Sequence, residues 1–107
     1  MFDCVMPTRN GRNGQLFTWE GTINIRNKKW ESDFSPIDPE GTTFDRCYTK
    51  AYLHHLVTCG EMMAAQIASL HNIAFYLRLV TAAREHILAG DFKEWKTAAV
   101  ARLGRRL

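Results

Sequence analysis

The chain has 107 residues and a hydrophobic fraction of 46%, which is enough for one domain with a core and excludes a disordered tail. It contains no apolar run of about 18 residues or more, so we expect no membrane span and no membrane partner. The N-terminus lacks a basic region followed by an apolar signal core. We therefore expect a cytoplasmic protein in which Cys4, Cys47 and Cys59 are reduced, with Cys4 packed as a small buried hydrophobic side chain.

The net charge of +3 is distributed unevenly along the chain. Residues 1–30 carry +3, residues 31–95 carry −4 and residues 96–107 carry +4. Basic ends around an acidic middle fit a site for a polyanion such as nucleic acid, and they equally fit two solvated faces that have no partner.

The amino-terminal segment places a carboxylate beside two arginines. Asp3 stands in a short apolar run, residues 2–6, which predicts a buried strand end stopped by Pro7. Arg9 and Arg12 follow in a segment that we expect to be a glycine-bearing loop. A carboxylate can attack an anomeric carbon, and guanidinium groups bind phosphates and base edges. The alternative is that Asp3 is structural and only caps the chain or pairs with one of the arginines.

Further along the chain, short strands give way to helices. Residues 15–27 alternate between apolar and polar side chains around Glu20-Gly21, which predicts a β-hairpin. Residues 31–43 hold Ser, Asp, Pro, Gly and paired Thr residues, which is typical of a loop and marks the clearest internal boundary.

The remaining residues have helical periodicity. We expect one helix over residues 45–57 and a second from Gly60-Glu61, with His71-Asn72 as a candidate interruption because Asn favours caps. The next helical segment should stop at Gly90, and a last helix should run from Asp91, as its cap, to about Arg102. The side chains that this last helix is expected to bury are Phe92, Trp95 and Val100.

The segment from Met1 to Gly14 closely resembles the signature motif of bacterial tRNA-guanine transglycosylase, also called queuine tRNA-ribosyltransferase. The resemblance covers essentially the whole chain and corresponds to the C-terminal quarter to third of that enzyme. Its first motif is long and specific. The supporting matches are Phe17-Thr18, Ile23 to Asn27, Ala51 to Leu56 and His71 to Tyr76.

The resemblance implies an α/β fold. The chain would be the C-terminal part of a (β/α)8 barrel with an inserted, mainly α-helical subdomain. Short strands would lie within residues 1–27, followed by three or four helices. Residues 1–30 would hold the last barrel strand with the RNA-reading loop and hairpin, and residues 31–107 the helical subdomain and final barrel helix. Barrel enzymes place catalytic groups at the C-terminal ends of their strands, which suits Asp3.

The resemblance also implies a reaction. The family replaces the wobble guanine of tRNAs with a GUN anticodon by a 7-deazaguanine, and bacterial members use 7-aminomethyl-7-deazaguanine in queuosine biosynthesis. Asp3 would be the nucleophile that attacks C1′ of the ribose. The residues that would read the neighbouring nucleotides are Thr8, Arg9, Asn10, Gly11 and Arg12. The family acts as a homodimer, and the residues that match its dimer contact are Tyr48, Tyr52 and His55. Its acid–base aspartate would lie outside these residues, so we expect them alone to be inactive.

One feature departs from the family. Most members bind a structural zinc ion through a C-x-C-x-x-C motif and a histidine that matches His71. The segment that matches the motif, residues 41–45, contains no cysteine, and Cys47 is a single thiol nearby. We expect no zinc and no other cofactor, with His71 as a cap or packing residue and with packing around Phe44 holding the subdomain.

Two alternatives remain open. The chain could be a non-catalytic RNA-binding or dimerisation subunit related to the transglycosylase, or a structural helical domain without an RNA role. The intact Asp3 and the arginine segment favour a catalytic origin.

Overall fold

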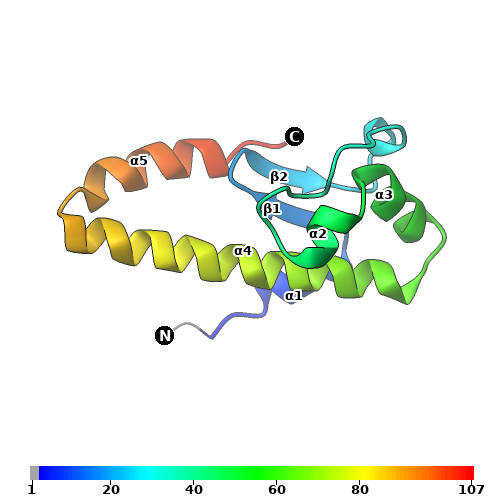
Figure 1. Ribbon diagram of the computed structural model, residues 1–107, viewed down its shortest axis with the longest axis horizontal. Helices are drawn as coiled ribbons and strands as arrows, with labels where there is room; N and C mark the ends of the chain where they lie inside the picture. Colours follow the sequence, from blue (N-terminus) through cyan, green and yellow to red (C-terminus); the bar gives the residue numbers. More distant parts are fainter. Residues whose placement is uncertain (1–2) are drawn as a thin grey trace.

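The computed structural model describes residues 3–107, an elongated molecule of 46 × 26 × 21 Å built around one long helix. This helix, α4, runs along the long axis; α1 and the β-hairpin pack against its middle, and α5 folds back beside its C-terminal half (Figure 1). The elements in order are α1 (Met6–Arg12), β1 (Gln15–Thr18), β2 (Gly21–Asn24), the 3-10 helix η1 (Lys28–Trp30), α2 (Thr43–Cys47), α3 (Lys50–Thr58), α4 (Met62–Ala89) and α5 (Phe92–Leu103).

The predicted hairpin is confirmed. Strands β1 and β2 pair antiparallel with Leu16 opposite Ile23, and both side chains face the core. The turn closes at Gly21, whose φ of 142° lies in a region that favours glycine. The outer edge of β2 is covered by the end of the chain, where the Thr22 N–H donates to Arg105 O and the Leu107 N–H donates to Thr22 O. The described residues therefore form an α/β arrangement with one two-stranded sheet, and a barrel is not part of it.

The expected strand end before Pro7 is wrong for the described residues 3–6. These residues are exposed, and from Met6 the chain is helical rather than a strand followed by a loop. Proline is tolerated in the first turn of a helix, where its missing N–H has no partner to lose, so Pro7 lies in the first turn of α1 instead of ending a strand. Cys4 is exposed rather than buried. The expectation for Met1 and Phe2 lies outside the described residues.

The single helix expected over residues 45–57 is divided into α2 and α3. Backbone groups of a preceding segment interrupt it, because the Ile37 N–H donates to Tyr48 O and the Lys50 N–H donates to Ser35 O. The Thr49 hydroxyl then caps α3 by accepting the Tyr52 N–H at 3.0 Å.

By contrast, α4 continues without interruption through His71-Asn72, and it stops at Gly90 as predicted, with a left-handed φ of 85°. The Asp91 side chain does not cap α5, because it accepts a hydrogen bond from His86 Nδ1 at 2.9 Å. In α5 the buried residue is Ala99; Val100 is 61% exposed, contrary to expectation, and Phe92 and Trp95 are half-buried.

The core lies between the hairpin, α3 and the N-terminal half of α4. Its fully enclosed side chains include Leu16, Ile25 and Leu53, each 0% exposed. In residues 3–107 the three cysteines are free and exposed, and no helix has a stretch long and apolar enough to cross a membrane.

Candidate functional site

Asp3 and the two arginines of α1 are exposed to solvent. Arg9 and Arg12 lie in the last turn of α1, three residues apart and therefore on neighbouring positions of one helix face. Within residues 3–107 Asp3 forms no ion pair with either arginine, so structural pairing does not account for its carboxylate there. All three charges are thus accessible to a ligand.

The other predicted RNA-reading residues are more buried than the two arginines. Thr8 is half-buried and its hydroxyl donates to Val5 O, and Asn10 is also half-buried. Gly11 is buried against α4, where an added Cβ would lie 2.9 Å from the backbone nitrogen of Ser69. Gly11 therefore allows α1 to approach α4 closely, which fixes the direction of the helix that carries the arginines.

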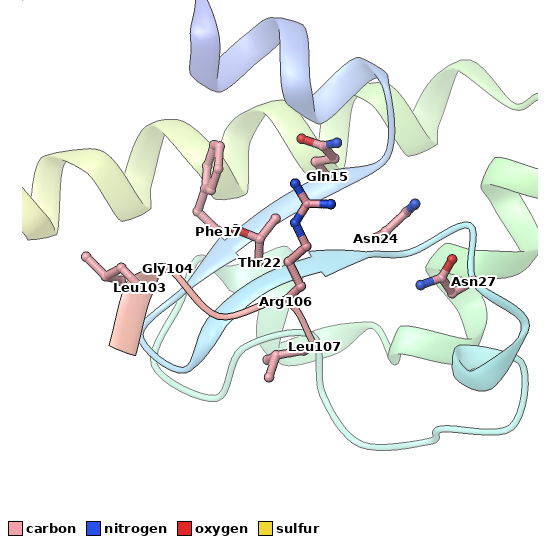
Figure 2. A pocket seen from close by; sticks show the side chains of 9 residues that line it. All are labelled: Gln15, Phe17, Thr22, Asn24, Asn27, Leu103, Gly104, Arg106 and Leu107. Atoms are coloured by element: carbon pink, nitrogen blue, oxygen red, sulfur yellow. The ribbon is translucent and has the colours of Figure 1, made fainter. Parts of the chain in front are cut away.

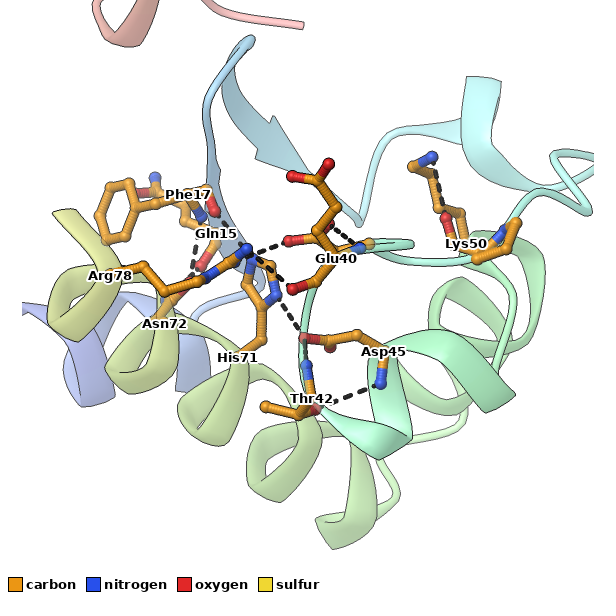
Figure 3. Close-up of polar contacts among 11 residues, drawn as sticks. Gln15, Phe17, Glu40, Thr42, Asp45, Lys50, His71, Asn72 and Arg78 are labelled. Atoms are coloured by element: carbon orange, nitrogen blue, oxygen red, sulfur yellow. Dashed lines mark hydrogen bonds and ion pairs between the residues drawn. The ribbon is translucent and has the colours of Figure 1, made fainter. Parts of the chain in front are cut away.

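Asn72 holds this helix in place. Its amide Nδ2 donates to Gln15 O at 2.9 Å, and its Oδ1 accepts the Phe17 N–H at 3.0 Å (Figure 3). Nδ2 also donates to Pro7 O at 3.0 Å. Asn72 is 0% exposed. The edge of β1 that does not face β2 is thus paired by a side chain of α4, and the same side chain anchors the start of α1.

His71, the residue before Asn72, forms hydrogen bonds to β1 and to α2. Its Nε2 lies 2.7 Å from Phe17 O and its Nδ1 lies 2.9 Å from Asp45 Oδ2, and both His71 and Asp45 are 0% exposed (Figure 3). A carbonyl oxygen only accepts, so Nε2 carries a proton. Asp45 Oδ2 also accepts the Thr42 N–H, and the Thr42 hydroxyl accepts the Asp45 N–H, which together form the capping box of α2.

Arg78 of α4 links this helix to the loop that precedes α2. Its Nη2 donates to Asp38 Oδ2 at 2.8 Å and its Nη1 donates to Glu40 O at 3.0 Å. Burial raises the pKa of the Asp38 carboxyl, but hydrogen bonds from Arg78 and the Glu40 N–H, with the charges of Arg78 and His71, outweigh it and hold this pKa below its usual value.

This lowered pKa predicts a pH dependence of stability. A depressed folded-state pKa stabilises the fold above the unfolded-state value of about 3.9, and the gain disappears as the pH falls through the folded-state pKa. We expect Asp38→Asn to lower the free energy of unfolding by about 1 kcal/mol at pH 7, since the pair is partly exposed, and by less at about pH 3, below the unfolded-state pKa. Urea denaturation at both pH values checks this, with Glu40→Gln as the control because Arg78 binds only the Glu40 carbonyl. Equal losses at both pH values would contradict it.

Asp38, Asp45 and His71 each offer one ligand atom within 4.8 Å of the others, so a metal must be considered. Asp45 Oδ1 is buried without a hydrogen-bond partner, which would suit a cation. The other two ligand atoms do not suit a cation, because Asp38 Oδ2 accepts a hydrogen bond from Arg78 and His71 Nδ1 is hydrogen-bonded to Asp45. A structural zinc site needs four ligands, commonly thiolates, and this set has no thiolate. The residues present do not fit a structural zinc ion.

The predicted dimer-contact residues lie together on the outer side of α2 and α3. The rings of Tyr48 and Tyr52 are 5.0 Å apart, and Phe44 stacks on Tyr48 at 6.2 Å. His55 follows on the exposed face of α3 and lies 3.7 Å from the thiol of Cys59. Phe44 is 43% exposed and stacks on Tyr48, which packs against the core, so it stands at the end of a surface row of aromatic rings.

A polar groove of about 330 Å³ lies beside the hairpin (Figure 2). Arg106 extends toward Gln15, and Asn24 and Asn27 lie at the right of the view, opposite Leu103 and Gly104. None of its lining side chains is a carboxylate. Of the basic residues in 96–107, Arg106 lines this groove. The sequence did not predict the groove, because the pairing of the chain end with β2 has no local sequence signal.

A family model described as queuine tRNA-ribosyltransferase matches residues 1–105. The chain therefore belongs to the queuine tRNA-ribosyltransferase family, the tRNA-guanine transglycosylases, which are transferases that act on tRNA.

Proposed function

We propose that this chain is part of an enzyme that exchanges the wobble guanine of tRNAs with a GUN anticodon for 7-aminomethyl-7-deazaguanine in queuosine biosynthesis. The observation that carries the proposal is the family match over residues 1–105 in a chain that keeps Asp3. Supporting it, Asp3 is exposed and is followed by a helix that presents Arg9 and Arg12 to solvent.

In the proposed reaction the Asp3 carboxylate attacks C1′ of the wobble ribose. An ester bond forms while the C1′–N9 bond breaks, and guanine leaves with the electron pair and takes up a proton from a general acid. N9 of the incoming base then attacks C1′. The ester bond breaks, Asp3 returns to the carboxylate, and the N9 proton passes to the acid–base group.

The residues of α1 are proposed to position the RNA. Arg9 and Arg12 offer planar, permanently charged donors for phosphates or base edges around the wobble position. Thr8 and Asn10 are their neighbours in α1, and Gly11 of the same helix lets α1 pack closely on α4. No metal or other cofactor takes part in this proposal.

The exposed aromatic row supports a homodimer as the working form. Tyr48, Tyr52 and His55 offer ring surface and hydrogen-bonding atoms on one side of the molecule. We propose that this surface contacts a second copy of the chain. The proposed location is the cytoplasm, where the tRNA substrate is found.

The acid–base group and most of the base pocket are expected in a longer protein that contains this segment. We therefore propose that residues 1–107 alone do not catalyse exchange. Incorporation of labelled guanine into tRNA, measured for the 107-residue protein and for the full-length enzyme, should show turnover for the second alone. Turnover by the short protein would contradict its inactivity, and no turnover by the full-length enzyme would contradict base exchange.

A non-catalytic RNA-binding or dimerisation subunit is the second candidate, favoured by the missing zinc cysteines. Such a subunit would bind tRNA with a steep salt dependence, since phosphate contacts release counterions. It would form no covalent adduct with RNA. A structural domain without an RNA role would neither bind tRNA in this way nor form a covalent adduct.

A further inference from the structure

The ring of His71 connects three separate parts of the fold. The residue belongs to α4, its Nδ1 faces Asp45 of α2 and its Nε2 donates to the backbone of β1 at Phe17 O. These partners are 26 and 54 residues away along the chain. Loss of this ring would release the α2 segment from the long helix and the hairpin at the same point.

We propose that the buried Asp45–His71 hydrogen-bonded pair does in this chain what a structural zinc ion does in most of its family: it fixes α2 to α4 and β1. The proposal rests on family membership and on contacts in this chain, and it does not depend on the proposed reaction. Its readouts are metal content and stability, so its failure would leave base exchange untouched.

The zinc motif spans six residues, so with its last cysteine at position 45 it begins at position 40, one residue before the segment 41–45. When the last cysteine of C-x-C-x-x-C is put at position 45, opposite His71, the other two fall at positions 42 and 40, which are Thr42 and Glu40 here. The Thr42 hydroxyl accepts the Asp45 N–H at 3.2 Å, and Glu40 O accepts from Arg78 at 3.0 Å. Thr42 and Asp45 therefore bond to each other beside His71, and Glu40 is linked to Arg78 of the same helix through its backbone carbonyl.

The contacts around the pair occupy groups that a metal ion would need. His71 Nε2 donates to a carbonyl oxygen and Nδ1 is hydrogen-bonded to Asp45 Oδ2, so both ring nitrogens are already engaged. These hydrogen bonds limit the cost of burying the pair at 0% exposure. Arg78 holds Asp38 Oδ2 in an ion pair, so this carboxylate oxygen is engaged as well.

The backbone around Asp45 is shaped for its carboxylate. A Cβ on Gly41 would collide with Asp45 Oδ2, so only glycine leaves room for the side chain at this point. The carboxylate thus occupies the space between the Gly41 backbone, the Thr42 N–H and the His71 ring.

The first test is metal dependence of the tag-free protein. Elemental analysis should find under about 0.1 mol of zinc per mole of chain, and neither EDTA nor added ZnCl₂ should move the melting temperature by more than about 1 °C. One equivalent of zinc, or a melting temperature that EDTA lowers and ZnCl₂ restores, would overturn the proposal.

The second test is a double-mutant cycle. Asp45→Ala and His71→Ala should each lower the melting temperature by about 10 °C or more, and the double variant should lose little beyond the larger single loss. Additive losses would overturn the proposal. The surface pair Asp91–His86 has the same 2.9 Å geometry at 55% and 33% exposure and is the matched control, with a loss for Asp91→Ala of under about 3 °C. Should the alanine variants not fold, Asp45→Asn keeps the side-chain shape, and a melting temperature equal to the wild type would overturn the proposal.

The third test exchanges the pair for the metal. The triple variant Glu40→Cys, Thr42→Cys, Asp45→Cys, with His71 retained, supplies three thiolates and one imidazole. It should bind one zinc ion per chain and melt at a temperature that falls sharply with EDTA. If the triple variant binds no zinc, position 45 does not correspond to a zinc ligand of the family, and the proposal is overturned.

Discussion

Replacing Asp3 by asparagine in the full-length enzyme is expected to abolish the covalent RNA intermediate and to lower the exchange rate by about 10⁴-fold or more. The amide keeps the size of the carboxylate but is a poor nucleophile, so attack on C1′ fails while tRNA still binds. Incubation with tRNA followed by denaturing electrophoresis detects the adduct, and labelled guanine incorporation measures the rate.

The control for this variant is Glu31→Gln. Glu31 is an exposed carboxylate in the same chain with no ion pair among the described residues, so its neutralisation should leave adduct and rate unchanged. An adduct that persists in Asp3→Asn would remove Asp3 from its proposed role and would leave the non-catalytic reading as the better one.

Replacing Asn72 by alanine is expected to lower the free energy of unfolding by about 3–5 kcal/mol. The change removes three hydrogen bonds at once and leaves Pro7 O, Gln15 O and the Phe17 N–H without their partner. Each buried polar group left unpaired costs about 1–3 kcal/mol. Urea denaturation, with the melting temperature as a second measure, gives the loss.

The matched control is Gln66→Ala. Gln66 is an exposed amide on the same helix, and its loss should change stability by less than about 0.5 kcal/mol. If Asn72→Ala were equally mild, the amide would not be what holds α1 and β1 on α4. Because α1 carries Arg9 and Arg12, Asn72→Ala in the full-length enzyme should also weaken tRNA binding.

The candidate site was only partly predictable from the amino-acid sequence. The motif shared with the family indicated Asp3 and the arginines, but the surroundings of these residues were predicted incorrectly. The apolar run at residues 2–6 has the composition of a strand, yet Pro7 suits the first turn of a helix as well as the end of a strand, and α1 packing on α4 through Gly11 decides between them. Periodicity does not report such contacts.

The sequence alone determined the features that depend on neighbouring residues and on motif identity. Glu20-Gly21 between alternating residues determined the hairpin, Gly90 determined the end of α4, and the motif from Met1 onward determined the family. The signals for the hairpin and for the end of α4 lie within a few residues of those features, because turns and caps are local backbone chemistry.

The tertiary structure decided how the polar residues of α4 are used. The sequence indicated His71-Asn72 as a candidate break in a helix, because the Asn side chain competes for nearby backbone groups. In the fold their partners lie elsewhere: Pro7 is 65 residues away from Asn72, and Asp45 is 26 residues away from His71. The backbone of α4 is then free to stay helical, and the two side chains hold α1, β1 and α2 together. A local sequence pattern does not indicate such distant partners, because only the folding of the chain brings them within hydrogen-bonding distance.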